Sequence, residues 1–382
     1  MNVTAIFAYT SYFGAEKANM EVFRLLKKAG HDLMLVTRRD IPEELKSHLL
    51  KEEFHSHKVE WGPDYLGFKN PISDYLKALY RMVTVPVELL RLDRQRKTDV
   101  IYVPNYLQFF FVWLYLLLTK KMTFFRIGDI PSTGLAHFLM WKYFINPRVT
   151  LYICNSEHGK SRLLKLIGDE HEKKVQVIRN IYNQPLKTVA KNFPQTFVPE
   201  CLFVGQMNRS KGAHIAIKAA IKICNVNENI IFSFVGMDRS GDELIKNLIE
   251  KISKDKNLSS RIHFYGYVTH DKVKSYYSKA HVLIVPSMFE DSSPNVVIEA
   301  RYLGLPVVAF PVGGISELVV HKKTGYLCNE SSLEALIEGI YSIISSPEAY
   351  KDLSEKSLDI SPEFQPKFIQ QAWLSIFEPS NY

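Results

Sequence analysis

The chain has 382 residues, a length that predicts two domains, each large enough to bury a hydrophobic core of its own. Hydrophobic residues make up 46% of the chain and charged residues 23%, which is typical of a globular protein and argues against a disordered or low-complexity class. The net charge of +8 comes from the first half, because residues 1–180 hold 27 Lys and Arg against 19 Asp and Glu, whereas residues 181–382 hold 21 of each.

Short apolar runs alternate with helical patterns from the N-terminus onward. The first residues lack the basic start and long apolar core of a signal peptide, so they predict a strand. Tyr106–Leu118 is apolar but too short to cross a bilayer, which predicts a buried helix and no transmembrane span. The runs expected as strands in the first half are Val3–Ala8, Leu33–Val36, Val100–Val103, Leu151–Cys154 and Val175–Ile178.

The second half repeats the alternation. Its expected strands are Leu202–Val204, Ile230–Val235, Ile262–Tyr265, Val282–Val285, Val307–Phe310 and Tyr326–Cys328. Strands of this length separated by helix-length segments predict an α/β protein with two Rossmann-like, doubly wound parallel-sheet domains. Three prolines within 183–200 place the boundary there, so we expect a first domain over 1–185 and a second over 198–363.

A basic cluster follows an amphipathic stretch in the first half. Arg91, Arg94, Arg96 and Lys97 come at the end of the helical pattern Tyr75–Leu92. Such a cluster forms either a solvated surface or a patch that approaches an anionic membrane or a phosphate-bearing acceptor. A nucleic-acid partner is not expected, because no recognised binding module is present and aromatic residues do not interleave with the basic ones.

The four cysteines are scattered along the chain as Cys154, Cys201, Cys224 and Cys328. No Cys-x-x-Cys spacing occurs, which argues against a zinc site or a redox pair. We therefore expect a reduced, cytoplasmic compartment.

A polar loop bounded by glycine follows the expected strand at 202–204. Gly205 lets backbone approach a ligand, and a helix expected to begin near Ala213 presents its N–H groups at the end of the loop. Lys211 and Arg209 place positive charge where a departing diphosphate builds negative charge. A plain strand-to-helix turn with solvated basic residues is the alternative.

Two carboxylates stand beside a second expected helix N-terminus. Asp291 precedes a helix expected to start at Ser293-Pro294, and Glu299 is expected two turns inside that helix, with seven residues between the two carboxylates. Helix N-termini suit phosphate, and carboxylates accept hydrogen bonds from sugar hydroxyls. Taken alone, the same residues equally describe an ordinary helix cap, with Ser293 as N-cap and proline at the first helical position.

Five elements of the second half resemble, in order, the motifs of retaining glycosyltransferases of family four, which have the GT-B fold. Asp291-x7-Glu299-Ala300 followed by Gly304-Leu305-Pro306-Val307-Val308-Ala309 is similar to the family's nucleotide-sugar motif, with Asp in place of its usual first Glu. The other similar elements are Gly205-Gln206 with Lys211-Gly212, Val235-Gly236, His263–Val268 and Gly313-Gly314-Ile315-Ser316-Glu317.

The resemblance implies a role for each matching residue of this donor site. Lys211 would stabilise the leaving diphosphate, and Arg209 would supply the charge that the family places where this chain has Gln206. Glu299 would accept hydrogen bonds from the nucleotide ribose, and either Asp291 or Glu290 would contact the transferred sugar. The remaining donor contacts would be backbone groups of Gly205, Ser293, Asn295 and Val296.

The first half resembles the family less closely. Gly14 stands in Phe13-Gly14-Ala15-Glu16, where the family often has Gly-Gly-x-Glu near the diphosphate. Asp129 stands where relatives commonly carry a His-Asp pair, with Gly128 in the place of the histidine, so Asp129 would contact acceptor or donor sugar, or else cap a helix. Ser156 is expected as an N-cap, and the C-terminal helix, about 364–382, would pack back on the first domain, as in relatives.

The resemblance implies a retaining, metal-independent glycosyltransferase whose two domains face an interdomain cleft. Its donor would be a nucleotide-diphosphate sugar acting as co-substrate, with no cofactor and no metal, and its acceptor a glycan or a lipid-linked molecule. No convincing Ser-His-Asp or Cys-His set and no Asp-x-Asp motif is present. The alternatives are a phosphorylase or nucleotide-sugar epimerase of the same fold, or a non-catalytic sugar-binding subunit. We expect the protein in the cytoplasm, at the inner face of the membrane if it docks there.

Overall fold

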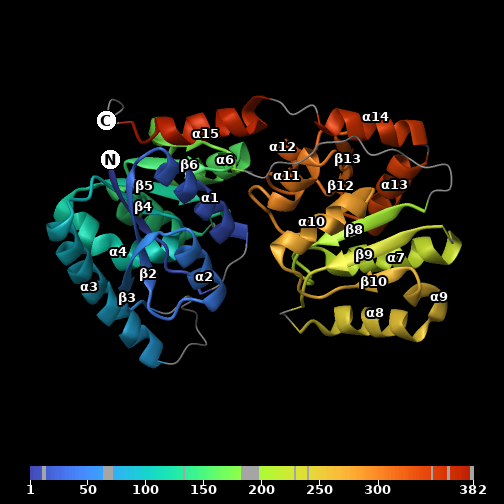
Figure 1. Cartoon of the computed structure of the whole chain (residues 1–382), viewed down its shortest axis with the longest axis horizontal. Helices are drawn as coiled ribbons and strands as arrows, with labels where there is room; N and C mark the ends of the chain where they lie inside the picture. The colour runs from blue at the N-terminus through green and yellow to red at the C-terminus, as the bar shows by residue number, and fades with distance from the viewer. Residues whose placement is uncertain are drawn as a thin grey trace. The chain divides into compact units, whose positions relative to one another are not determined.

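The computed structural model describes residues 1–10, 14–62, 72–131, 134–181, 198–227, 229–238, 241–345, 347–358 and 362–378. It consists of two compact units (Figure 1). Unit 1 comprises Met1–Asn183 and Glu363–Tyr382, and unit 2 comprises Gln184–Pro362. Residues 11–13, most of the expected linker and residues 379–382 lie outside the described residues.

Unit 1 is built on a seven-stranded sheet in the order β3-β2-β1-β4-β5-β6-β7, with all neighbouring strands parallel. The strands are β1 (Asn2–Ile6), β2 (Asp32–Arg38), β3 (His55–Val59), β4 (Val100–Val103), β5 (Met122–Ile127), β6 (Leu151–Cys154) and β7 (Val175–Val177). The strand order reverses between β1 and β4, which makes that pair the topological switch point of the sheet.

Both faces of this sheet are buried. Along β4, Val100 and Tyr102 belong to one hydrophobic cluster, while Ile101 and Val103 belong to another, because alternate side chains point to opposite faces. The helical segments of unit 1 are α1 (Gly14–Lys28), α2 (Glu43–Lys51), α3 (Ile72–Gln95), α4 (Tyr106–Thr119), α5 (Leu135–Leu139), π-helix η1 (Met140–Ile145), 3-10 helices η2 (Asn146–Arg148) and η3 (Asp169–Lys174), α6 (Glu157–Ile167) and α15 (Pro366–Ser375), with 3-10 helix η4 (Pro362–Phe364) at the unit boundary.

Two strands of unit 1 were not among the expected runs. β3 carries the polar sequence His-Ser-His-Lys-Val and only Val59 is buried, since the strand lies at the sheet edge and needs no apolar face. β5 follows α4 after two lysines, and Lys120 ends the helix in a left-handed conformation with φ of 52°. Because the turn is so short, no polar segment in the sequence separates the helix from the strand, and β5 was not predicted.

The expected buried helix at 106–118 is confirmed as α4. Asn105 caps it by accepting a hydrogen bond from the N–H of Gln108 at 2.9 Å. Among the described residues, no helix is both long and apolar enough to cross a membrane.

The C-terminal helix α15 is part of unit 1. Trp373 is fully buried among side chains of the β1–β4 core, and its indole N–H donates to the carbonyl of Arg179 at 3.2 Å. The guanidinium of Arg126 lies 5.4 Å from the centre of the Trp373 ring. In Figure 1, α15 is drawn in red beside the blue and green elements of this unit.

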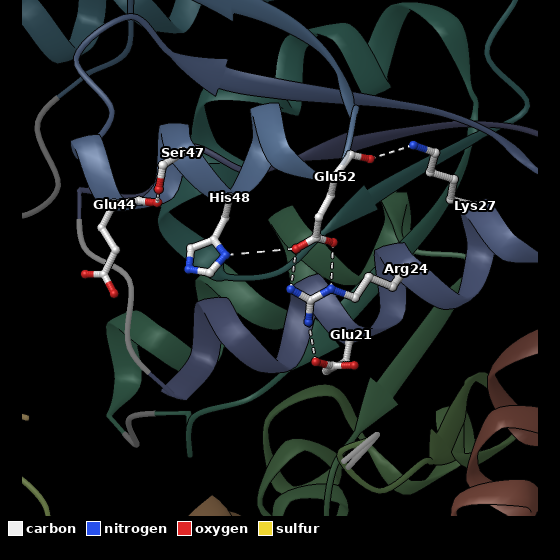
Figure 2. Close-up of polar contacts among 7 residues, drawn as sticks. All are labelled: Glu21, Arg24, Lys27, Glu44, Ser47, His48 and Glu52. Atoms are coloured by element: carbon white, nitrogen blue, oxygen red, sulfur yellow. Dashed lines mark hydrogen bonds and ion pairs between the residues drawn. The ribbon is translucent and has the colours of Figure 1, made fainter. Parts of the chain in front are cut away.

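Helix α2 is fastened to α1 by a polar cluster (Figure 2). Arg24 donates to both carboxylate oxygens of Glu52, just beyond the end of α2, and also pairs with Glu21. Lys27 donates to the carbonyls of Glu52 at 2.6 Å and Glu53 at 2.9 Å. A cation at these carbonyls complements the negative end of the helix.

Unit 2 is built on a six-stranded parallel sheet in the order β10-β9-β8-β11-β12-β13, which reverses between β8 and β11. Its strands are β8 (Glu200–Val204), β9 (Ile231–Val235), β10 (Ile262–Phe264), β11 (Val282–Val285), β12 (Val307–Ala309) and β13 (Gly325–Leu327). Its helices are α7 (Ala213–Val226), α8 (Glu243–Lys254), α9 (Lys256–Ser259), α10 (His270–Lys279), α11 (Asn295–Tyr302), α12 (Ile315–Leu318), α13 (Leu333–Ile344) and α14 (Pro347–Leu358). The predicted class, two doubly wound parallel-sheet α/β domains, is confirmed.

Candidate functional site

The candidate donor site lies at the switch point of unit 2. Strands β8 and β11 are neighbours there, and the loops 205–212 and 286–294 follow their carboxyl ends. In open parallel sheets, ligands bind beyond the carboxyl ends of the strands where the order reverses. The two segments predicted from the sequence are therefore brought together by the fold.

The loop 205–212 is held by its own hydrogen bonds and by close backbone packing. Asn208 Oδ1 accepts from the hydroxyl of Ser210 at 2.8 Å and from the N–H of Lys211 at 2.9 Å. Gly212 has φ of +70°, and a Cβ there would lie 1.8 Å from the carbonyl oxygen of Pro286. Only glycine therefore allows α7 to start so close to the end of β11.

The loop 286–294 is fixed from both sides. The N–H of Met288 donates to the carbonyl of Ser210 at 2.8 Å, and the N–H of Gly314 donates to the carbonyl of Asp291, also at 2.8 Å. Gly313, with φ of +63°, leaves room for that second contact, because a Cβ there would lie 2.5 Å from the Asp291 oxygen. The glycine pair after β12 thus holds the backbone of Asp291 in place.

Lys211 and Asp291 form an ion pair across the switch point. Lys211 Nζ lies 2.5 Å from Asp291 Oδ2, and the two side chains are 40% and 21% exposed. Asp291 Oδ1 also accepts a hydrogen bond from the N–H of Ser293 at 3.3 Å. The half-exposed ammonium and the carboxylate lie where the two loops meet. A ligand that carries phosphate and hydroxyl groups can replace their contact, with phosphate binding the ammonium and hydroxyl groups binding the carboxylate.

Helix α11 begins later than the sequence suggested. Its first residue is Asn295 and its N-cap position is Pro294, without a side-chain cap, so the expected start at Ser293-Pro294 and the capping interpretation of Ser293 are wrong. Glu299 consequently lies just over one turn inside the helix, not two. Ser293 is buried in the preceding loop.

Three sequence-predicted positions of α11 are partly exposed. Asn295, Val296 and Glu299 are only partly buried, in contrast to most of the other residues of α11. Glu290 is likewise partly buried.

Arg209 and Gln206 lie in the donor loop but point to other partners. Arg209 Nε donates to Asp242 Oδ2 at 2.6 Å, and this hydrogen bond lowers the pKa of the Asp242 carboxyl. Gln206 Oε1 accepts from the amide of Asn208 at 3.0 Å. A Cβ at Gly205, where φ is +154°, would make only ordinary van der Waals contact with the ring of Phe203 at 3.9 Å. The structure brings Lys211 to Asp291 and engages Arg209 at the start of α8.

Unit 1 has a polar pair at its own switch point. Tyr9 follows β1 and Asn105 follows β4, and the Asn105 side chain lies near the Tyr9 hydroxyl, which accepts a hydrogen bond from Asn19 Nδ2 at 3.5 Å. Burial, together with the carboxylates of Glu16 and Asp129, raises the pKa of Tyr9. Gly14 is the first residue of α1, directly after the undescribed residues 11–13.

A hollow opens beside this pair at the carboxyl ends of β4 and β5. It contains about 460 Å³ of empty space, including open solvent. Its lining is mostly apolar and includes Ile127 and Trp141, while its ionisable side chains are Tyr106, Arg126, Asp129 and His137. Asp129, predicted from the sequence, therefore lines a concave surface that accommodates a ligand with apolar and hydroxyl groups.

Sequence reasoning missed several residues of these sites. Tyr9, His137 and Trp141 reach the unit 1 site from segments with no recognisable motif, and only the fold brings them together. Asn208 carried a usable signal, because Asn in a polar loop commonly binds the backbone two or three residues on. The N-cap prediction for Ser156 is confirmed, since its hydroxyl accepts from the N–H of Gly159 at 2.9 Å.

The cysteine side chains belong to the hydrophobic cores of the two units. All four cysteines are buried free thiols, and burial raises the pKa of each. Within the described part of the chain, no group of three or more His, Cys, Asp or Glu side chains could hold a metal ion.

Comparison with known proteins assigns both units. Residues 13–183 match the family model described as Glycosyltransferase Family 4, and residues 187–359 match the model described as Glycosyl transferases group 1. Over 176 residues the chain is 31% identical to an uncharacterized glycosyltransferase of Haemophilus influenzae, a match that covers 46% of this chain and about half, 48%, of that protein. A longer match, 27% identical over 350 residues, covers 85% of this chain and 80% of the glycogen synthase of Mycobacterium tuberculosis.

Among solved structures, the Anabaena protein HepE in complex with UDP and glucose is similar over 100% of both chains. Its TM-score is 0.79 at 17% sequence identity, so the likeness concerns the fold. The two adjacent family models and the shared architecture lead to one conclusion. This chain belongs to the GT-B glycosyltransferases of family four, the glycosyl transferases of group 1.

Proposed function

We propose that this protein transfers a sugar, with retention of anomeric configuration, from a nucleotide-diphosphate donor to a hydroxyl of a glycan or lipid-linked acceptor. The observation that carries the proposal is the Lys211–Asp291 pair at the switch point of unit 2. A cation and a carboxylate within one contact distance match the two halves of such a donor, its diphosphate and its sugar.

In the donor complex, the Lys211 ammonium moves from Asp291 to the diphosphate. Departure of the nucleoside diphosphate builds negative charge on its oxygens, and the ammonium then held beside them stabilises that charge by about 3–4 kcal/mol. The N-termini of α7 and α11 start beside the same loops and add backbone N–H groups. HepE, solved in complexes with UDP and with UDP-glucose, is a fold relative that supports a donor of this class.

Once Lys211 has turned to the diphosphate, Asp291 is released to accept hydrogen bonds from sugar hydroxyls, with Glu290 next to it in the same loop. Glu299, on the partly exposed side of α11, accepts from the ribose hydroxyls. Sites that bind hydroxyls through carboxylates reject analogues that lack them, because the carboxylate then stays buried without a partner.

The chemistry we propose takes place on one face of the sugar. A bond forms between the anomeric carbon and the acceptor oxygen as the bond to the diphosphate oxygen breaks. The electron pair leaves with the diphosphate, and the acceptor proton passes to a phosphate oxygen. No protein nucleophile is needed. The charges of Lys211 and the helix N-termini take the part that a divalent ion plays in other transferases, so activity in excess EDTA should equal activity without it.

The acceptor binds to unit 1 in this proposal. The hollow at the ends of β4 and β5 offers apolar side chains together with Asp129 and His137, which suits a sugar ring or a glycan joined to an apolar carrier. Asp129 positions the attacking hydroxyl. We place the reaction in the cytoplasm, in cell-surface polysaccharide or glycoconjugate synthesis.

The test has two parts. A thermal-shift screen of nucleotide sugars identifies the donor, and NMR of the product then gives its anomeric configuration. Retention supports the proposal, while inversion overturns the mechanism. Lys211→Ala should lower transfer by about 100- to 1,000-fold. The matched control Lys222→Ala, which removes a lysine of α7 paired with Glu334 on the surface, should leave transfer unchanged. Equal activity of the two variants would contradict the site.

A non-catalytic sugar-binding subunit is the second candidate. It is favoured by the neutral Gln206 in the position of the family's arginine and by the engagement of Arg209 with Asp242. If this candidate is correct, the protein binds a glycan, but no nucleotide diphosphate shifts its melting temperature. A same-fold phosphorylase or epimerase would instead act on phosphate, or on the donor without an acceptor.

A further inference from the structure

Among the described residues of unit 1, helix α3 has one buried side and one exposed side. Its inner side packs against α4 and the sheet through Ala78, Val85, Leu89 and Leu92, which are all buried. Figure 1 shows α3 in cyan alongside α4. A surface helix packed in this way is expected to present polar and charged residues on its outer side.

The outer side of α3 is apolar instead. The exposed residues that form this stripe recur at intervals of three or four, and their exposed fractions range from 40% to 77%. They are Ile72, Leu76, Leu79, Tyr80, Val83 and Val87. The spacing keeps them on one face of the helix over more than four turns. Single exposed apolar residues are common, but a continuous row marks an interaction surface.

Basic residues continue the row at its C-terminal end. Arg91 and Arg94 follow Val87 by four and seven residues and are exposed on the same face, and Lys97 is exposed just beyond the helix. Glu88, one residue after Val87 and therefore turned away from the row, accepts from Arg91 at 2.7 Å. The row therefore ends in positive charge.

The three acids of α3 lie off this face. Asp74 pairs with Lys77, Glu88 pairs with Arg91, and Asp93 pairs with Lys121 at 3.1 Å on the inner side. Within residues 72–95, which are all described, no carboxylate falls on the helix face that holds Leu76, Val83 and Val87. This helix face is apolar, ends in cations and lacks anions. It complements a surface whose outer layer is negatively charged and whose interior is apolar.

The neighbouring helical layer repeats the pattern on a smaller scale. Helix α4 contacts α3 on one side and the η1 segment on the other, where Trp113 stacks on Phe144 at 4.2 Å between ring centres. In α5 and η1, exposed Leu135, Leu139 and Tyr143 recur every four residues. Apolar side chains thus reach solvent from both flanks of α4.

We infer that α3 docks unit 1 onto an anionic membrane surface, with the helix lying in the plane of the interface. The stripe enters the boundary between headgroups and acyl chains, while Arg91, Arg94 and Lys97 contact anionic headgroups. The helix lies on the bilayer and does not span it, since no described helix is apolar enough to cross. This inference does not depend on the donor site, and vesicle binding measured without any sugar nucleotide keeps the two apart.

The experiment is sedimentation of the full chain with vesicles of phosphatidylglycerol and phosphatidylcholine, against vesicles of phosphatidylcholine alone. We expect binding to the anionic vesicles that weakens with salt. The double variant Leu79→Glu/Val83→Glu changes two outward-facing side chains and should lower the partition coefficient at least about tenfold. Removing two headgroup contacts by Arg91→Ala/Arg94→Ala should lower it about 5- to 30-fold at low salt.

The matched control is Leu50→Glu/Val226→Glu, which adds the same charges at two exposed apolar positions outside α3. It should bind vesicles like the unsubstituted protein. Circular dichroism melts of all variants should coincide, because none of the changed side chains is buried. Equal vesicle binding by Leu79→Glu/Val83→Glu and the control would overturn the inference. So would a dimer in sedimentation velocity that this variant alone dissociates, since the stripe would then bind a second copy of the chain.

Discussion

Units 1 and 2 share the same order over six parallel strands, yet their switch points carry different chemistry. In unit 2 the loops after β8 and β11 bring Lys211 and Asp291 into an ion pair. In unit 1 the corresponding loops after β1 and β4 bring together the polar side chains of Tyr9 and Asn105 beside a largely apolar hollow. The doubly wound sheet decides where a ligand can bind, and the loop residues decide which ligand. This difference underlies the proposal that the donor binds to unit 2 and the acceptor to unit 1.

The largest expected effect tests whether the units are separate structures. Trp373→Ala removes a fully buried ring from unit 1 and should lower the free energy of unfolding of that unit by about 3–5 kcal/mol. All four tryptophans of the chain belong to unit 1, so the three that remain report its urea transition by fluorescence.

The control is Phe368→Ala, which truncates a half-exposed ring on the same helix and should cost far less. The unit 2 transition, followed by hydrogen exchange of residues 198–358, should not move in either variant. If unit 2 loses as much stability as unit 1, the two units unfold as one, and the comparison between them loses its structural basis.

Gly212→Ala tests the backbone of the donor site. A Cβ at this position meets the Pro286 carbonyl and the residue has φ of +70°, so we expect unit 2 to lose roughly 2–4 kcal/mol, from left-handed strain and displaced backbone. Hydrogen exchange of residues 198–358 measures the loss. Gly266→Ala is the control, because Gly266 has φ of +63° but nothing within 4 Å of a built Cβ. If both variants lower the free energy of unfolding of unit 2 by the same amount, the clash with the Pro286 carbonyl contributes nothing to the loss.

Paired substitutions at the two switch points sharpen the assignment of donor and acceptor. Asp291→Asn should lower the rate of transfer by about 10- to 100-fold and weaken donor binding, because the proposed carboxylate contacts to the sugar are lost. Asp129→Asn should raise the KM of the acceptor by roughly tenfold and leave the donor KM unchanged. Steady-state kinetics with both substrates varied separates the outcomes. The reverse pattern would exchange the roles of the units.

The smallest effect concerns His214 in the first turn of α7. Burial, with the nearby cations Lys218 and Arg209, lowers the pKa of this imidazole, while Asp242 acts weakly in the other direction. As pH falls below about 6.5, the unfolded chain takes up a proton that the folded one resists, so unit 2 loses stability.

His214→Gln should flatten this loss between about pH 6.5 and 5, as measured by thermal unfolding of unit 2. His55→Gln, at an exposed position of unit 1, should leave the slope for unit 2 unchanged. An unchanged slope in His214→Gln would show that the imidazole protonates as readily in the folded state as in the unfolded one.

Much of the fold follows from local pattern. The six strands of unit 2 were all expected from apolar runs, because the inner strands are mostly buried and the edge strands β10 and β13 still carry Ile262, Phe264 and Leu327. In unit 1 the edge strand β3 was not predicted, because its sequence is polar and only one of its side chains is buried. Motif spacing likewise indicated Lys211, Asp291 and Glu299 as residues of one site.

Other features were decided by the tertiary structure. Local sequence gave no reason to start α11 at Asn295, because that start depends on how Asp291 and the Gly313-Gly314 turn fix the preceding loop. The pairing of Arg209 with Asp242 joins residues 33 positions apart. The outward face of α3 is the strongest case. Its amphipathic sequence predicts a helix with one apolar side, but burial of Ala78, Val85 and Leu89 against α4 uses one apolar face and leaves a second exposed.

The sequence by itself determined the class of fold, the family and the residues from which a donor site can be built. Those properties depend on side-chain type and on short-range spacing, which the chain carries locally. The tertiary structure decided which charges meet, which glycines have no substitute, and which apolar side chains remain in contact with water. These features depend on contacts between segments that are tens to hundreds of residues apart in the sequence. Such contacts form only when the chain folds, so they cannot be read from a local sequence pattern.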